Sequence, residues 1–138
     1  MTRKNEVTVV QQENPTSLAR TEQERDYMRP AADVYESLEA YVLMIDMPGA
    51  GKESISVTMD RSALVVKGSV EPLHEEKASL LVGEIRTTGY YRVFNLGDDI
   101  DGNTVDARYE LGVLTVKLFK KEEVRPREIS INSYSGKE

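Results

Sequence analysis

The sequence predicts an all-β protein, built as an antiparallel β-sandwich with a flexible N-terminal arm and a C-terminal extension. Three observations favour this fold class. Short stretches of the chain alternate apolar and polar residues, they recur about every 8–12 residues, and turn residues separate them. We find no convincing amphipathic helix between them. The length of 138 residues suggests one domain, because about 100 residues can bury a core of their own.

The expected strands follow one another from residue 31 to residue 119, which we take as the bounds of the domain. The third of them alternates cleanly and puts Ile55, Val57 and Met59 on one face. Turn residues such as Pro, Gly, Asp and Ser lie between the strands and end them. The expected strands are residues 33–36, 41–47, 54–59, 63–70, 89–96, 105–109 and 113–119.

Residues 1–30 form a polar arm that contains neither Phe nor Trp. Residues 7–10 are suited to pairing as a strand, and residues 17–28 fit a short helix that ends before Pro30. That helix would lack an apolar stripe, so nothing obvious would hold it against the domain. We therefore expect the arm to be mostly mobile.

A long connection, residues 71–86, separates two of the strands. It begins with a polar stretch and then carries the apolar residues Leu80, Leu81 and Val82. A connection of this length in a compact domain is usually functional or holds a small element of its own.

Residues 120–138 form a charged extension with two isoleucines near its end. Pro126 disfavours the continuation of a central strand, so Ile129 and Ile131 lie beyond the sandwich. They share one side of any extended segment, because side chains two positions apart point the same way.

Composition excludes several kinds of chemistry. The chain has no cysteine and a single histidine, His74, which lies among glutamates and is expected to be solvated rather than a base or metal ligand. Asp98, Asp99 and Asp101 lack the further ligands of a calcium loop and are expected to form a turn. The net charge of -6 argues against nucleic acid or an anionic membrane as the main partner. We expect a cytoplasmic protein that is not an enzyme and uses no cofactor, with no signal peptide or membrane span.

Six short motifs lie in order between residues 31 and 132: DVYE at 33–36, IDMPG at 45–49, LVVKG at 64–68, GYYRVFNL at 89–96, ARYELGVL at 107–114 and ISI at 129–131. Together they resemble the α-crystallin domain of bacterial-type small heat shock proteins, the Hsp20 family. That resemblance implies an immunoglobulin-like sandwich. Leu111 departs from the family's usual Asn before Gly112, and Phe119 replaces its usual proline. The polar arm departs further, because the family's arms are usually rich in Phe and Trp.

The resemblance implies that Ile129 and Ile131 dock on a neighbouring subunit and build a larger oligomer. Such a tail adds to a strand edge and sinks its side chains into a groove. The alternative is that both isoleucines fold back on their own sandwich as a final strand. The resemblance implies a groove between the strands at 63–70 and 113–119, with walls formed by Leu64, Val66, Leu114, Val116 and Leu118.

The resemblance also implies a dimer formed by strand exchange. Leu80, Leu81 and Val82 would pair with the partner's first strand, at Asp33, Val34 and Tyr35, and Arg86 and Arg92 would form salt bridges across the interface. The alternative is that residues 80–82 cap their own sheet and that both arginines are solvated.

The function that the resemblance implies is an ATP-independent holdase chaperone, which binds partly unfolded client proteins and prevents their aggregation. A non-assembling sandwich adaptor like the co-chaperone p23, which binds one folded partner, is the alternative. A paralogous small heat shock protein is a further possible partner. Because the arm lacks Phe and Trp, the candidate client contacts outside the sandwich are Val7, Val9, Val10, Tyr27 and Met28.

Overall fold

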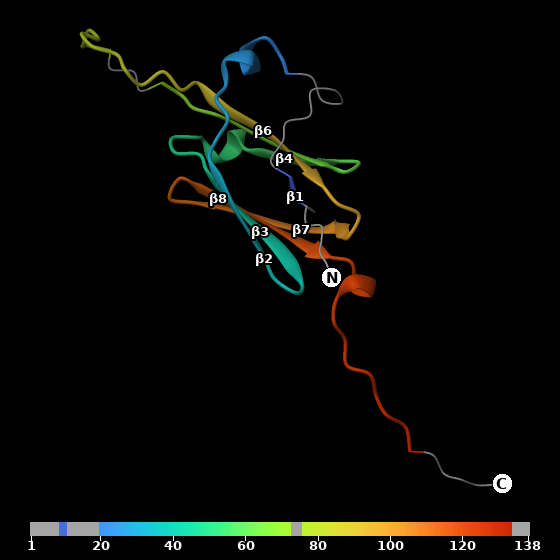
Figure 1. Ribbon diagram of the computed structural model, residues 1–138. Coiled ribbons are helices and arrows are strands. Elements are labelled where there is room, and N and C mark those ends of the chain that lie inside the picture. The colour runs from blue at the N-terminus through green and yellow to red at the C-terminus, as the bar shows by residue number, and fades with distance from the viewer. Residues whose placement is uncertain (1–8, 11–19, 73–75, 134–138) are drawn as a thin grey trace, which may run out of the picture.

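The computed structural model describes residues 9–10, 20–72 and 76–133 of the chain (Figure 1). These residues form two four-stranded antiparallel sheets that pack face to face around one apolar core. Among them, no helix is longer than a short 3-10 turn. The all-β sandwich predicted from the sequence is therefore confirmed.

Each sheet has two central strands and two edge strands. The first sheet has the order β1-β6-β5-β4 and the second has the order β2-β3-β8-β7. The strands of the first sheet are β1 (Val9–Val10), β6 (Gly89–Leu96), β5 (Ala63–Ser69) and β4 (Ser56–Asp60). Those of the second sheet are β2 (Ala32–Glu36), β3 (Ala40–Asp46), β8 (Val113–Lys120) and β7 (Ile100–Glu110).

The alternation of side chains decides which face of each strand is buried. Leu43 and Ile45 of β3 face the first sheet, and they are fully buried with Leu64 and Phe94 in the main core cluster. Strand β7 is longer than predicted, since it begins at Ile100, and its pairing with β8 is irregular between Ile100 and Val105. The polar residues of that irregular stretch are what hid the start of the strand in the sequence.

The helix expected at residues 17–28 is wrong over the part that the structure describes. Residues 20–28 contain only the 3-10 turn η2 (Gln23–Asp26), and the other two turns are η3 (Lys52–Ser54) and η4 (Glu122–Val124). Thr21 and Glu24 satisfy each other's backbone N–H groups, at 3.3 and 3.2 Å, which is a capping arrangement without a helix of useful length behind it. An apolar stripe is what a longer helix would have needed.

Two tyrosines tie the turn after β3 to both sheets. Tyr90 of β6 donates its hydroxyl hydrogen bond to the carbonyl of Pro48 at 2.6 Å. Tyr109 of β7 donates to the carbonyls of Met47 and Ala50, at 2.8 and 3.1 Å. Burial raises the pKa of the Tyr90 phenol above its ordinary value of 10.0, with smaller contributions from Tyr109 and Asp46.

The turn between β7 and β8 is left-handed at two successive residues. Leu111 has φ 52° and Gly112 has φ 80°. Glycine takes this conformation freely, whereas a leucine is strained there. The departure at Leu111 therefore leaves the turn in place at a cost in conformational energy.

Candidate functional site

Within residues 20–72 and 76–133, no group of three or more His, Cys, Asp and Glu side chains is arranged to hold a metal ion. His74 lies outside the described residues. No described helix is long and apolar enough to cross a membrane. Asp101 accepts hydrogen bonds from the backbone of Asn103 and the hydroxyl of Thr104, and these bonds lower the pKa of its carboxyl. The expected turn is present at Asp98 and Asp99, whereas Asp101 lies in strand β7, so the expectation was wrong for that residue.

The tail isoleucines do not return to their own sandwich. Residues 126–133 form no strand, and Ile129 and Ile131 are 74% and 95% exposed. Figure 1 shows the tail running away from both sheets. The structure therefore leaves these two side chains available to another molecule, and the alternative of a final strand within the same chain is not what it shows.

The groove expected between residues 63–70 and 113–119 is not present in the structure, so this prediction was wrong. Strands β5 and β8 are central strands with a neighbour on each side, so neither presents a free edge. The five side chains expected to line the groove are between 0% and 2% exposed and belong to the sandwich core. The resemblance and strand parity placed them together on one side of their strands, but that side is the interior. These five side chains are Leu64, Val66, Leu114, Val116 and Leu118.

The free edges lie one strand further out, on β4 and β7. These strands end the two sheets on the same side of the sandwich, where a hollow of about 200 Å³ is lined in part by Met59 of β4 and Gly102 of β7. Val57 and Met59 are half-buried and pack against the core, and Val105 of β7 is 37% exposed. An edge with unpaired backbone groups beside half-buried apolar residues suits an added strand.

The long connection presents its apolar residues to solvent. Leu80, Leu81 and Val82 are 84%, 91% and 73% exposed, and none of them lies in a strand. Residues 80–82 therefore do not cap their own sheet. Ile85, which the sequence reasoning passed over, is 94% exposed in the same connection. An apolar residue between Glu84 and Arg86 was the available signal.

The proposed target of that connection is an edge strand. Asp33, Val34 and Tyr35 lie in β2, which ends the second sheet. Tyr35 is 56% exposed, whereas Val34 is half-buried against the core. The strand thus has one side free for a partner.

Of the two candidate arginines, only Arg86 is exposed. Arg92 is 3% exposed, donates to the carbonyl of Pro30 at 2.7 Å and lies 4.7 Å from the centre of the Phe94 ring. The prediction that Arg92 forms a salt bridge across a surface interface was therefore wrong. Arg92 of β6 instead holds Pro30, where the N-terminal segment leaves the side of β6 and leads into β2.

The end of the N-terminal arm lies against the first sheet. Val9 and Val10 pair with Leu96 and Asn95 of β6, which confirms the strand expected there for these two residues. Met28 pairs with Tyr90 and is 48% exposed, and Tyr27 is half-buried. Val7 lies outside the described residues. The sequence reasoning missed this docking because it looked for an apolar stripe.

Comparisons with known proteins agree on one family. A family model described as the Hsp20/alpha crystallin family matches residues 33–132. Spore protein SP21 of Stigmatella aurantiaca is 36% identical over 79% of this chain, and the match spans 64% of that protein. Small heat shock protein C2 of Rickettsia felis is 30% identical over 74% of this chain and 67% of that protein. The chain thus spans just under two thirds of the Stigmatella relative.

Solved structures give the same answer for the fold. A small heat-shock protein from Xylella fastidiosa superposes with a TM-score of 0.61 at 28% identity, over 75% of this chain and 96% of that one. Heat shock protein 16.0 from Schizosaccharomyces pombe gives 0.63 at 26% identity, over 76% of this chain and 99% of that one.

Proposed function

The chain belongs to the Hsp20/alpha crystallin family, and we propose that it is an ATP-independent holdase chaperone for partly unfolded proteins. The observation that carries this proposal is the apolar surface that extended segments leave in solvent. Leu80, Leu81, Ile85 and Ile131 are each at least 84% exposed, although the sandwich already has a complete core. Grouped apolar residues on a surface mark sites of interaction with other proteins.

Self-assembly uses the tail. Ile129 and Ile131 dock on a neighbouring subunit, and the free edges of β4 and β7 with the hollow between them support a seat there. Full burial of one isoleucine is worth about 1.5–3 kcal/mol, so two of them, less the cost of ordering the tail, give a contact of modest strength. Many such contacts hold an oligomer together while single subunits still exchange.

Dimerisation uses the long connection. Residues 80–82 of one subunit add to β2 of its partner, where Asp33 and Tyr35 are exposed and the strand edge is free. Arg86 is exposed and available for an ion pair across that interface, whereas Arg92 is not. The exposure of Leu80, Leu81 and Val82 in the single chain supports a partner that covers them.

The adaptor alternative is not favoured. A sandwich that binds one folded partner without assembling needs neither the exposed tail isoleucines nor the apolar connection. Co-assembly with a paralogous small heat shock protein and a cytoplasmic location remain predictions.

The test is light scattering from a heat-denaturing client protein, with and without this chain, in the absence of ATP. The holdase proposal expects suppression of scattering at near-stoichiometric ratios. A folded sample that gives no suppression would contradict it and would leave the family assignment standing.

A further inference from the structure

The outer face of the first sheet, which points away from the core, carries a second apolar cluster. Ala63 and Val65 of β5 and Tyr91 and Val93 of β6 form it, and all four are between 2% and 4% exposed. They alternate along their strands with Leu64, Val66 and Phe94 of the main core. An antiparallel sheet commonly leaves one face to water, so the burial of this face requires a cover.

Residues 20–30 supply part of that cover from the same chain. Tyr27 packs against the cluster, and the guanidinium of Arg20 lies 4.3 Å from the centre of the Tyr91 ring. The N–H of Met28 donates to the carbonyl of Gly89 at 2.9 Å, and the N–H of Tyr91 donates to the carbonyl of Met28 at 3.0 Å. In Figure 1 this blue segment lies beyond the sheet that contains β6, on the side away from the second sheet.

The seat of Tyr27 is built for an aromatic ring. A Cβ atom placed on Gly89 would collide with three carbons of the Tyr27 ring. The backbone of Gly89 does not have a positive φ, so glycine is not required there by the strand. The missing side chain is instead the space that the ring occupies.

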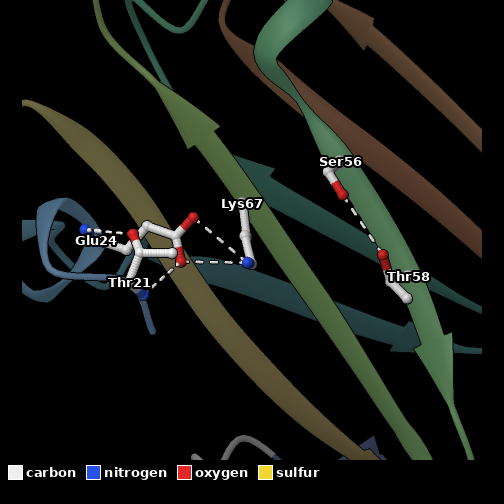
Figure 2. Close-up of polar contacts among 5 residues, drawn as sticks. All are labelled: Thr21, Glu24, Ser56, Thr58 and Lys67. Carbon is white, nitrogen blue, oxygen red and sulfur yellow. Dashed lines mark hydrogen bonds and ion pairs between the residues drawn. The ribbon is translucent and has the colours of Figure 1, made fainter. Parts of the chain in front are cut away.

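An ion pair fixes the segment one strand away. The Nζ of Lys67 on β5 lies 3.1 and 3.4 Å from the two carboxylate oxygens of Glu24 (Figure 2). The side chains of Lys67 and Glu24 are 29% and 17% exposed, so water screens the pair only partly. Thr21 orients the carboxylate through the reciprocal hydrogen bonds described above.

We propose that this outer face is a second binding site for extended client segments, and that residues 20–30 occupy it in the resting chain. The inference rests on the proposed chaperone function. The chemistry of the resident segment defines the ligand: an acidic residue, then an aromatic residue three positions later, then a backbone that pairs with the edge of β6. Lys67, the space above Gly89 and the edge at Gly89–Tyr91 recognise these three features in turn.

The resident segment is held weakly enough to be exchanged. The described contacts that join it to the sheet are the Glu24–Lys67 ion pair, the Tyr27 ring, the stacking of Arg20 on Tyr91, the hydrogen bond from Arg92 to Pro30 and one isolated strand bridge, and no helix longer than four residues supports them. Contacts of this number open locally at a much lower free energy than the sandwich unfolds. A client that supplies the same three contacts therefore competes for the face.

A single substitution empties the ring space and loosens the resident segment. In the full-length Tyr27→Ala chain the resident ring is gone, while Lys67 and Gly89 remain. The probe is a fluorescein-labelled peptide with the sequence of residues 20–30, and its binding is followed by fluorescence anisotropy. We expect it to bind the Tyr27→Ala chain about tenfold tighter than the wild-type chain, whose face is occupied.

Control variants separate binding at this site from nonspecific binding of the peptide. Leu38→Ala removes a 71% exposed apolar side chain from the turn between β2 and β3 and leaves peptide binding at the wild-type level. Tyr27→Ala combined with Gly89→Ala fills the ring space and loses the gained affinity. Should Gly89→Ala fail to fold, Tyr27→Ala combined with Lys67→Glu replaces it: this chain rejects the peptide and binds the Glu24→Lys peptide instead. Binding that survives both changes overturns the site.

The client assay then tells the two proposals apart. The inference expects Tyr27→Ala to suppress client aggregation at a lower ratio than the wild type does, and excess peptide to cancel that gain. If the wild type suppresses aggregation but the Tyr27→Ala chain binds no peptide, the site is wrong and the chaperone function stands. If the peptide binds and no chain suppresses aggregation, the chaperone function fails and the acidic-aromatic selectivity of the face stands.

Discussion

The two ends of the described chain behave in opposite ways. Residues 20–30 are mostly charged or polar, yet they lie on the first sheet and help to bury its outer face. Residues 126–133 carry Ile129 and Ile131, yet they run clear of the sandwich with both side chains exposed (Figure 1). Apolar content therefore does not decide which end docks.

Fit to the chain's own surface decides it. Tyr27 finds a space above Gly89, and Glu24 finds Lys67 at ion-pair distance. The tail instead leaves β8 through η4, where Arg125 donates to the carbonyl of Lys120 at 2.7 Å and Pro126 follows. The contrast suggests that the first end is closed within one subunit and that the second is kept for a neighbour.

The largest expected effect comes from removing the two tail isoleucines that we propose dock on a neighbouring subunit. Ile129→Ala combined with Ile131→Ala should reduce the particle mass to that of a dimer, because about 3–6 kcal/mol of gross burial is lost at every docked tail. Size-exclusion chromatography with multi-angle light scattering measures the mass. Ser130→Ala, between the two isoleucines, is the matched control and should assemble normally. An unchanged mass in the double variant removes the docking role of the tail.

Hydrogen exchange sharpens the same contrast through its dependence on concentration. The amides of Met28 and Tyr91 are paired within one chain, so their protection should not change on dilution. The amide of Ile131 should gain protection only at concentrations where the protein assembles. Mass spectrometry of deuterated peptides reads both in one experiment. If protection of the Ile131 amide persists after the subunits dissociate, the tail must bind to the sandwich of its own subunit.

The sequence carries the strands and their parity but not the order of the strands in the sheets. The resemblance placed Leu64 and Val116 on the walls of one docking groove. The two do share one side of the strands, but that side is the buried core. Whether β5 lies at an edge depends on which distant segments pair beside it, and residue spacing does not report this. Arg92 was misplaced for a related reason: a charged residue is expected outside, and only the crossing of the chain at Pro30 gives it a buried partner.

The covered face was similarly hidden. Gly89 looks like a strand boundary, and Glu24 looks like one charge among many in a polar arm. Their roles depend on contacts over more than forty residues of sequence, such as Lys67 to Glu24, which differ by 43 positions. The tail isoleucines were predictable because they form a local pattern that needs no long-range partner in the same chain.

Breaking the ion pair should loosen the N-terminal segment and leave the tail as it was. In the Lys67→Glu chain we expect trypsin to cut after Arg25 at least about threefold faster, because local opening becomes easier. Cleavage after Arg127 in the exposed tail provides the internal standard and should keep its rate. Gel or mass analysis of early time points measures both.

The charge-swapped chain tests whether the pair itself is responsible. Glu24→Lys combined with Lys67→Glu should restore slow cleavage after Arg25, followed here with an arginine-specific protease because the introduced lysine is itself a trypsin site. Lys52→Glu, an equal charge change on the exposed turn η3, should leave cleavage after Arg25 at the wild-type rate. Fast cleavage in the swapped chain would mean that Lys67 supports the segment by packing alone.

High pH should destabilise the sandwich through Tyr90, the residue with which Met28 of the N-terminal segment pairs. The pKa of Tyr90 is raised in the folded chain, so its proton contributes stability that is complete below about pH 10 and is lost as the pH rises through the folded value. Deprotonation removes the hydrogen bond to Pro48 and disturbs the residue with which Met28 pairs. Urea unfolding of wild type and Tyr90→Phe between pH 9 and 11 should show that the variant lacks the tyrosine's share of the alkaline loss. Identical pH profiles would assign that loss to other groups.

The smallest effect concerns the scaffold that both ends share. Leu111 is fully exposed and has φ 52°, so its side chain buries nothing and its backbone is strained. Leu111→Asn should raise the free energy of unfolding by about 0.5–1 kcal/mol, because asparagine accepts the left-handed conformation more readily. Chemical denaturation measures the gain, and Val124→Asn, which replaces a half-exposed apolar residue at a negative φ, is the control for polarity alone. Particle mass and cleavage after Arg25 should not change in Leu111→Asn, since neither end touches this turn. A change in either would show that docking at the ends depends on the stability of the whole sandwich and not on the local fit of each segment.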